Sequence, residues 1–203
     1  MTAGLAATGI VALLVASSPA ILSVLLGSPI LFYGLMFAQL GLVVAFSSMA
    51  PRVTSATAAL MFFAYAALTG ITFSTIFLVY TAGSIARVFF ISAGAFAGLS
   101  IFGMTTKRDL GVIGRFALFA IIGIIVASIV NIFLQSTGLD WIVSIAGVLV
   151  FGGLTAYDTQ RLKAMFAQGA VHGNLPLIGA LTLYLDFINM FLFLLRIFGR
   201  RRA

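Results

Sequence analysis

The chain has 203 residues, of which 63% are hydrophobic and 7% charged, and its formal net charge is +7. Soluble domains carry about 25% charged residues, so this composition excludes a water-facing globule and predicts an all-α, polytopic membrane protein. The absence of cysteine excludes disulfides, thiolate catalysis and cysteine-based metal sites. Most of the Lys and Arg residues flank apolar runs, so the positive charge indicates membrane topology and not nucleic-acid binding.

Apolar runs separated by polar or Gly/Pro breaks predict seven membrane spans in a single domain, residues 1–203. In chain order they cover 4–26, 30–47, 54–80, 86–104, 114–134, 141–157 (extending as far as 161) and 177–198. The first run resembles the apolar part of a signal peptide but lacks a positive N-terminal segment, so we expect it to be a transmembrane helix.

The distribution of positive residues predicts the orientation of the spans, because Lys and Arg are enriched in cytoplasmic loops. An N-terminus inside the cell places these residues in cytoplasmic loops: Arg52, Lys107, Arg108, Arg115, Arg161 and Lys163. The arginines at 200–202 favour the opposite orientation, which places the C-terminus in the cytoplasm. If one segment is re-entrant and only six spans cross, both termini lie in the cytoplasm. These arginines either anchor the last helix end or also contact anionic lipid headgroups.

Small residues at close spacing in the fourth and sixth spans predict close approach of helix backbones. They are Ala93, Gly94, Ala97 and Gly98 in the fourth span, and Gly147, Gly152 and Gly153 in the sixth.

Two of the four acidic residues lie inside the last two apolar segments, and the chain has no Glu. They are Asp158 and Asp186, whereas Asp109 and Asp140 fall in polar breaks. An ionisable side chain at membrane depth costs a few kcal/mol or more, so it indicates a functional site.

Helical spacing places each aspartate on a polar face. Thr182, Asp186 and Asn189 share one face of the seventh span, and Thr155 shares a face with Asp158 in the sixth. Because adjacent spans run antiparallel, we expect the two aspartates to meet.

Two carboxylates a few ångströms apart cannot easily both ionise, so the pair is expected to share a proton. A shared proton would hold the two helices together as a pH-sensitive latch, and its loss would allow repulsion or cation binding. Ca²⁺ prefers oxygen ligands, and Asn189, Thr182 and backbone carbonyls are candidates to supplement Asp158 and Asp186. The alternative is purely structural: Asp158 pairs with Arg161, and Asp186 accepts a hydrogen bond from Tyr or Asn. The single histidine, His172, has no acidic neighbour and is a poor metal ligand.

The segments around both aspartates resemble the Bax inhibitor family, also called the transmembrane Bax inhibitor motif family. The matching segments are 154–160 (LTAYDTQ) and 179–191 (GALTLYLDFINMF), supported by 105–110 (TTKRDL) and 131–133 (NIF). The resemblance implies seven helices with the last one central, and a pH-sensitive Ca²⁺ leak controlled by the aspartate pair, which Asp158 and Asp186 match. It also implies a basic latch near the end of the second helix, for which Arg52 is the nearest candidate. Gln39 stands where many members carry a second-helix glutamate.

Two other functions stay open at this point. Bacterial members of the family resemble modulators of a membrane-bound ATP-dependent protease, a role that needs no pore. Intramembrane aspartyl proteases also pair two aspartates, but their second one follows a Gly-x-Gly pattern, whereas Asp186 follows Leu-Tyr-Leu. We therefore expect no enzymatic activity and no cofactor. Lipid, protons and Ca²⁺ are the expected partners, and the bacterial inner membrane is the expected location.

Overall fold

The computed structural model describes residues 1–167 and 173–202. All of the regular elements in these ranges are helices, and six are long and apolar enough to cross a membrane, or seven if one bent pair counts as a span. The expected all-α, polytopic fold is therefore confirmed. His172 lies outside the described residues.

The helices fall into two compact units, each with its own internal contacts. The first unit comprises residues 1–81, 170–184 and 201–203, and the second comprises 82–169 and 185–200. Helix α9 (Leu175–Phe198) begins in the first unit and ends in the second. Half of the residues in an apolar 18-residue stretch of α9 are buried, against 6–33% in the corresponding stretches of the other five spans. The single-domain organisation and the central position of the last helix stay predictions.

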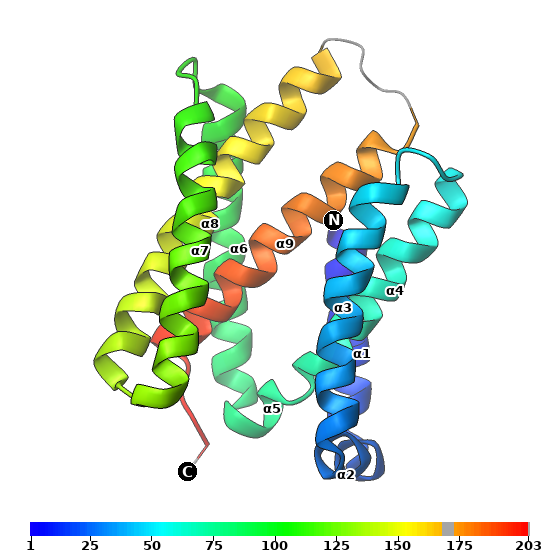
Figure 1. Ribbon diagram of the computed structural model, residues 1–203, viewed down its shortest axis with the longest axis vertical. Coiled ribbons are helices and arrows are strands. Elements are labelled where there is room, and N and C mark those ends of the chain that lie inside the picture. Colours follow the sequence, from blue (N-terminus) through cyan, green and yellow to red (C-terminus); the bar gives the residue numbers. More distant parts are fainter. Residues whose placement is uncertain (168–172, 203) are drawn as a thin grey trace. The chain divides into compact units, whose positions relative to one another are not determined.

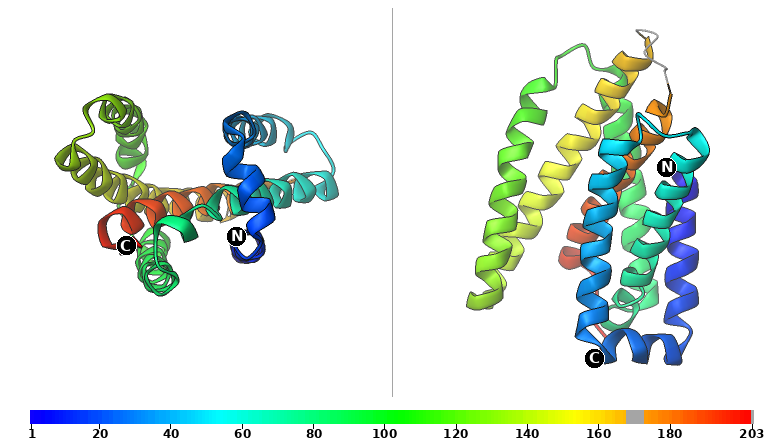
Figure 2. Two further views of the ribbon diagram at one scale, coloured as in Figure 1. Left: turned by 90° about the horizontal axis from the view of Figure 1, so that it is seen from below. Right: turned by 45° about the vertical axis from the view of Figure 1, so that its right-hand side comes forward.

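The first span is not one continuous helix, contrary to the prediction. Helix α1 (Thr2–Ala16) is followed by α2 (Pro19–Gly27), and the two axes bend by 92° (Figures 1 and 2). Proline lacks a backbone N–H and its ring clashes with the preceding turn, so it favours the first position of a new helix. Pro19 occupies this position in α2, after an extended Ser18.

Helix α4 (Ser55–Phe73) packs against both α1 and α3 (Pro29–Met49), which are its neighbours in the first unit (Figure 1). Thr54 caps α4, where its hydroxyl accepts a hydrogen bond from the Thr57 N–H at 3.2 Å. The predicted third span is interrupted at residues 74–75, before the short helix α5 (Ile76–Val79). Ser74 and Thr75 donate their hydroxyls to carbonyls of the preceding turn, which competes with regular helix geometry.

In the second unit, α8 (Thr137–Ala167) packs between α6 (Ala82–Thr105) and α7 (Gly111–Leu134) (Figure 1). The glycines of α8 lie in close contact with neighbouring side chains: a Cβ at Gly152 would be 3.2 Å from Leu99, and one at Gly153 would be 3.1 Å from Ile113. A side chain at Gly147 would overlap the ring of Phe193. The predicted close packing of the sixth span is therefore confirmed.

The same expectation is wrong for the two glycines of the fourth span. A Cβ at Gly94 or Gly98 would have nothing within 4 Å among the described residues. Gly103, near the end of α6, is instead the glycine that packs against α8. Spacing alone does not show which face of a helix carrying several small residues meets its neighbour.

Candidate functional site: a buried carboxyl pair

The side chains of Asp158 on α8 and Asp186 on α9 lie close enough to interact within the second unit. Asp158 is 9% exposed and Asp186 is 4% exposed. Helical spacing on two antiparallel spans predicted that the two side chains would meet, and they do. Their role as a cation site or pH sensor stays a prediction.

A hydrogen bond between two carboxyl groups requires a proton on one of them, because an ionised carboxylate only accepts. Oδ2 of Asp186 has no hydrogen-bond partner among the described residues. A buried polar atom without a partner is rare and costs free energy. The pair therefore keeps one acceptor position open, which suits a proton, a water molecule or a cation.

The polar groups around the pair are committed to their own helices. Thr155 donates to the Phe151 carbonyl at 2.8 Å, and Thr159 donates to the Thr155 carbonyl at 2.6 Å. On α9, Thr182 donates to Ile178 and Asn189 donates to Leu185. The threonine hydroxyls have used their single donors in these bonds, whereas the Asn189 amide keeps a second N–H.

The structural alternative of an Asp158–Arg161 salt bridge does not fit the geometry. Arg161 lies close enough to act electrostatically on Asp158. Within the described ranges, however, the ion pair that forms joins Arg196 to Asp140 and does not involve Arg161. A hydrogen bond from Tyr or Asn to Asp186 is likewise absent there, and the charged side chain that interacts with Asp186 is Asp158.

The carboxyl pair supplies few ligands for a tightly held metal ion. Among the described residues, no cluster of three or more His, Cys, Asp or Glu side chains is present. Ca²⁺ takes 6–8 oxygen ligands, so two carboxylates, threonine hydroxyls and water would surround it only loosely. Such a donor set fits a passing cation better than a resident one.

The candidate latch, Arg52, lies in the exposed turn that follows α3, in the first unit. The aspartates belong to the second unit, so the latch role of Arg52 stays a prediction. Gln39, by contrast, has a clear structural role: its amide donates to Thr72 Oγ1 at 3.0 Å and to the Leu68 carbonyl at 3.3 Å. It ties α3 to α4.

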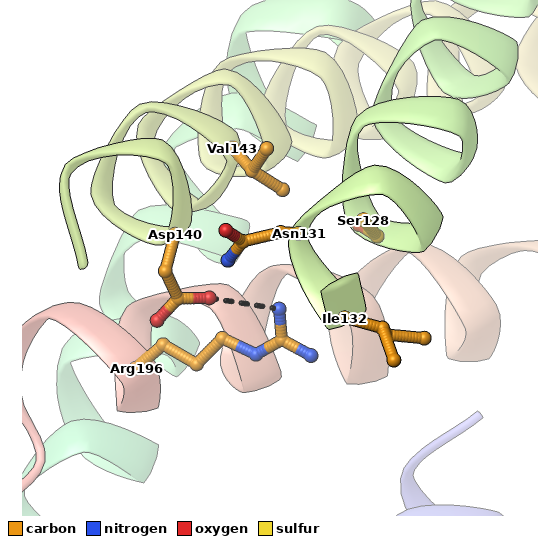
Figure 3. A pocket seen from close by; sticks show the side chains of 6 residues that line it. All are labelled: Ser128, Asn131, Ile132, Asp140, Val143 and Arg196. Atoms are coloured by element: carbon orange, nitrogen blue, oxygen red, sulfur yellow. Dashed lines mark ion pairs between the residues drawn. The ribbon is translucent and has the colours of Figure 1, made fainter. Parts of the chain in front are cut away.

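One polar cluster was not predicted from the sequence. Asp140 and Arg196 form an ion pair at 3.8 Å between the start of α8 and the end of α9 (Figure 3). In the sequence, Asp140 falls in a polar break and no motif distinguishes Arg196. The available signal was that opposite charges stand at span ends on the same side of the membrane.

These helices define a polytopic α-helical membrane protein with a carboxyl pair buried between two of its spans. The chain belongs to the Bax inhibitor family, since it matches the family described as "Inhibitor of apoptosis-promoting Bax1" over residues 1–203. The resemblance stated from the two aspartate segments is thereby confirmed.

Bacterial relatives cover the whole chain. The inner membrane protein YbhL of Escherichia coli strain K12 is 49% identical over 207 aligned residues, which span 100% of this chain and 88% of YbhL. An uncharacterized protein of Deinococcus radiodurans is 45% identical, over 99% of this chain and 87% of its own length. An uncharacterized protein of Borreliella burgdorferi is 40% identical, over 100% of this chain and 89% of its own length. With its membrane-spanning helices, the protein is a multi-pass protein of the inner membrane.

Proposed function

We propose that the protein is a proton-gated cation leak that conducts Ca²⁺, in which Asp158 and Asp186 form the gate. The single observation that supports this proposal most is the direct interaction of two nearly inaccessible carboxyl groups on different spans. Ionisable groups at membrane depth mark ion pathways and proton relays in other membrane proteins.

The proposed gate works through the number of protons that the pair holds. With one proton, a carboxyl–carboxyl hydrogen bond joins α8 to α9 and the path is closed. When this proton is lost, two negative charges face each other in a poorly solvated site. They separate the helices or attract a cation, so cation flux is expected to rise as the pH rises.

The test is Ca²⁺ flux into liposomes that contain the purified protein, measured across pH. We expect wild-type flux to rise with pH and Asp186→Asn to flatten the profile, because asparagine cannot give up a proton. Asp109→Asn is the matched control: Asp109 is exposed and accepts a hydrogen bond from the Gly111 N–H at 2.8 Å, outside the pair. A wild-type flux that does not respond to pH, or an unchanged profile in Asp186→Asn, would remove the gate.

Regulation by protein contact is the second candidate, since the family description names an inhibitor of another protein, Bax1. In this role the protein would modulate a membrane-bound ATP-dependent protease and would not need to conduct ions. A variant with no flux that still alters the activity of such a protease in cells would separate the two functions. For intramembrane proteolysis, cleavage of a transmembrane reporter that is lost in Asp158→Ala would be the deciding result. We propose no catalytic role for the pair.

A further inference from the structure

A second polar site lies in the second unit, at the ends of three spans. A cavity of about 290 Å³ is lined by Asp140, Arg196, Asn131 and Ser128, together with two apolar side chains (Figure 3). Its two charged residues come from different helices, and their side chains face each other across the cavity. Neither aspartate of the carboxyl pair lines this cavity.

The position of this cavity along the spans matches the level of lipid headgroups. Asp140 is in the first turn of α8, Arg196 is in the last turn of α9, and Asn131 lies near the end of α7 at Leu134. Because all three helices are membrane spans, these ends lie where the apolar core of the bilayer gives way to water. Trp141, next to Asp140, is 58% exposed, and tryptophan is enriched at this interface.

The two charges are only loosely paired. Their nearest atoms are 3.8 Å apart, and the side chains are 46% (Arg196) and 43% (Asp140) exposed. Charge-assisted hydrogen bonds are shorter, about 2.7–2.9 Å. Neither side chain forms a hydrogen bond within the part of the chain that the structure describes, and the Arg196 guanidinium lies over the Phe193 ring at 5.4 Å. The N–H edge of Arg196 and the carboxylate of Asp140 therefore both keep capacity for a ligand.

An apolar cavity continues from the polar one. It measures about 340 Å³ and shares Ser128 and Ile132 with the polar cavity. The rest of its lining is aliphatic or aromatic, apart from Asn189 on α9. It reaches Ile121 on α7. At 1.5 Å per residue, the stretch from Ile132 to Ile121 runs about 16 Å along α7. Together the two cavities form a groove along α7, polar at one end and apolar along its length. This combination matches the headgroup and one acyl chain of a single lipid.

We propose that this groove binds one phospholipid with a primary ammonium headgroup, such as phosphatidylethanolamine. Arg196 binds the phosphate, Asp140 accepts a hydrogen bond from the ammonium, and an acyl chain lies along the apolar cavity. A choline headgroup has no N–H to donate to Asp140. An anionic glycerol headgroup would meet the same Arg196 but would leave the carboxylate without a partner.

Trp141 is the only tryptophan in the chain and follows Asp140 directly, so its fluorescence reports on the lipids around this end of α8. The full-length protein is placed in phosphatidylcholine bilayers that contain a small, fixed fraction of one brominated lipid. Bromine quenches tryptophan on contact, so the extent of quenching ranks the local lipids. We expect brominated phosphatidylethanolamine to partition to Trp141 about three- to fivefold more than brominated phosphatidylcholine, the range of one exposed charge interaction. Brominated phosphatidylglycerol should show no such advantage.

Two variants test the assignment of each charge. Asp140→Asn leaves Arg196 alone, so the preference should move from the ethanolamine lipid to phosphatidylglycerol. Arg196→Gln should abolish the preference for the ethanolamine lipid without creating one for phosphatidylglycerol. Asp109→Asn changes an acidic residue just before the start of α7, at the end of the helix opposite to Asn131, and this variant should behave like wild type. Equal quenching of wild type by the ethanolamine and choline lipids would overturn the proposal, as would an ethanolamine preference that both variants retain.

Discussion

Gly103 on α6 lies in direct backbone contact with Ala156 on α8, two residues before Asp158. A side chain at Gly103 would overlap the carbonyl oxygen of Ala156, with the Ala156 carbonyl carbon at 3.0 Å. Backbone atoms cannot move away as a flexible side chain can, so only glycine allows the two helices to approach this closely. This contact fixes the position of the α8 turn that carries Asp158.

We expect Gly103→Ala to destabilise the protein by about 1–3 kcal/mol, the usual cost of forcing an extra methyl group into a close-packed contact. Thermal unfolding in detergent measures the effect. Gly94→Ala is the matched control on the same helix, because a Cβ there meets nothing within 4 Å. Equal stability of the two variants would show that the α6–α8 contact is not as close as described.

The apolar runs predicted where most spans lie, but not where every helix ends. The last span was predicted at 177–198 and is observed as Leu175–Phe198. Helix α8 continues to Ala167, beyond the predicted span 141–157 and beyond its extension to 161. Hydropathy marks the part of a helix that sits in lipid, whereas backbone hydrogen bonds carry the helix on into water. The bend before Pro19 was missed because the run on both sides of it is equally apolar.

The candidate site was predictable only in part. Helical spacing was sufficient to place Asp158 and Asp186 on polar faces of neighbouring spans. The Asp140–Arg196 pair was not predictable in this way, because the two residues are far apart in sequence and no periodic pattern connects them. Their contact depends on how α8 and α9 pack, and packing is a tertiary property that single-helix periodicity does not contain.

Within the first unit, the hydroxyl groups of Thr8 and Tyr184 are 2.6 Å apart. Thr8 has one hydroxyl hydrogen and a carbonyl acceptor, Ala66, at 2.9 Å, so Tyr184 can donate to Thr8. We expect Tyr184→Phe to lower the free energy of unfolding by about 0.5–1.5 kcal/mol, the net value of one hydrogen bond. Tyr33→Phe, at a position 60% exposed, should change nothing measurable. A loss of equal size in both variants would contradict the role of the Thr8 contact.

Gln160 on α8 holds the connection between α6 and α7 in place. Its side-chain oxygen accepts a hydrogen bond from the Leu110 N–H at 3.0 Å, and its amide donates to the Arg108 carbonyl at 2.8 Å. We expect Gln160→Ala to release this connection and to speed tryptic cleavage after Lys107 and Arg108 about fivefold, equivalent to about 1 kcal/mol of local stability.

Cleavage after Arg52 is the internal reference for this experiment, because Arg52 lies in the turn after α3, in the other unit. If both sites were cleaved faster by the same factor, Gln160 would act on global stability and not on the α6–α7 connection.

The central claim is that Asp158 and Asp186 share one proton, and infrared spectroscopy of the carboxyl C=O stretch tests it most directly. The spectrum is simple because the chain has four acidic side chains, all Asp. We predict one protonated carboxyl in wild type near neutral pH that loses its proton at alkaline pH. This signal should be missing from the double variant Asp158→Asn/Asp186→Asn and intact in Asp109→Asn. A wild-type spectrum with no protonated carboxyl near neutral pH, or a signal that persists in the double variant, would contradict the claim.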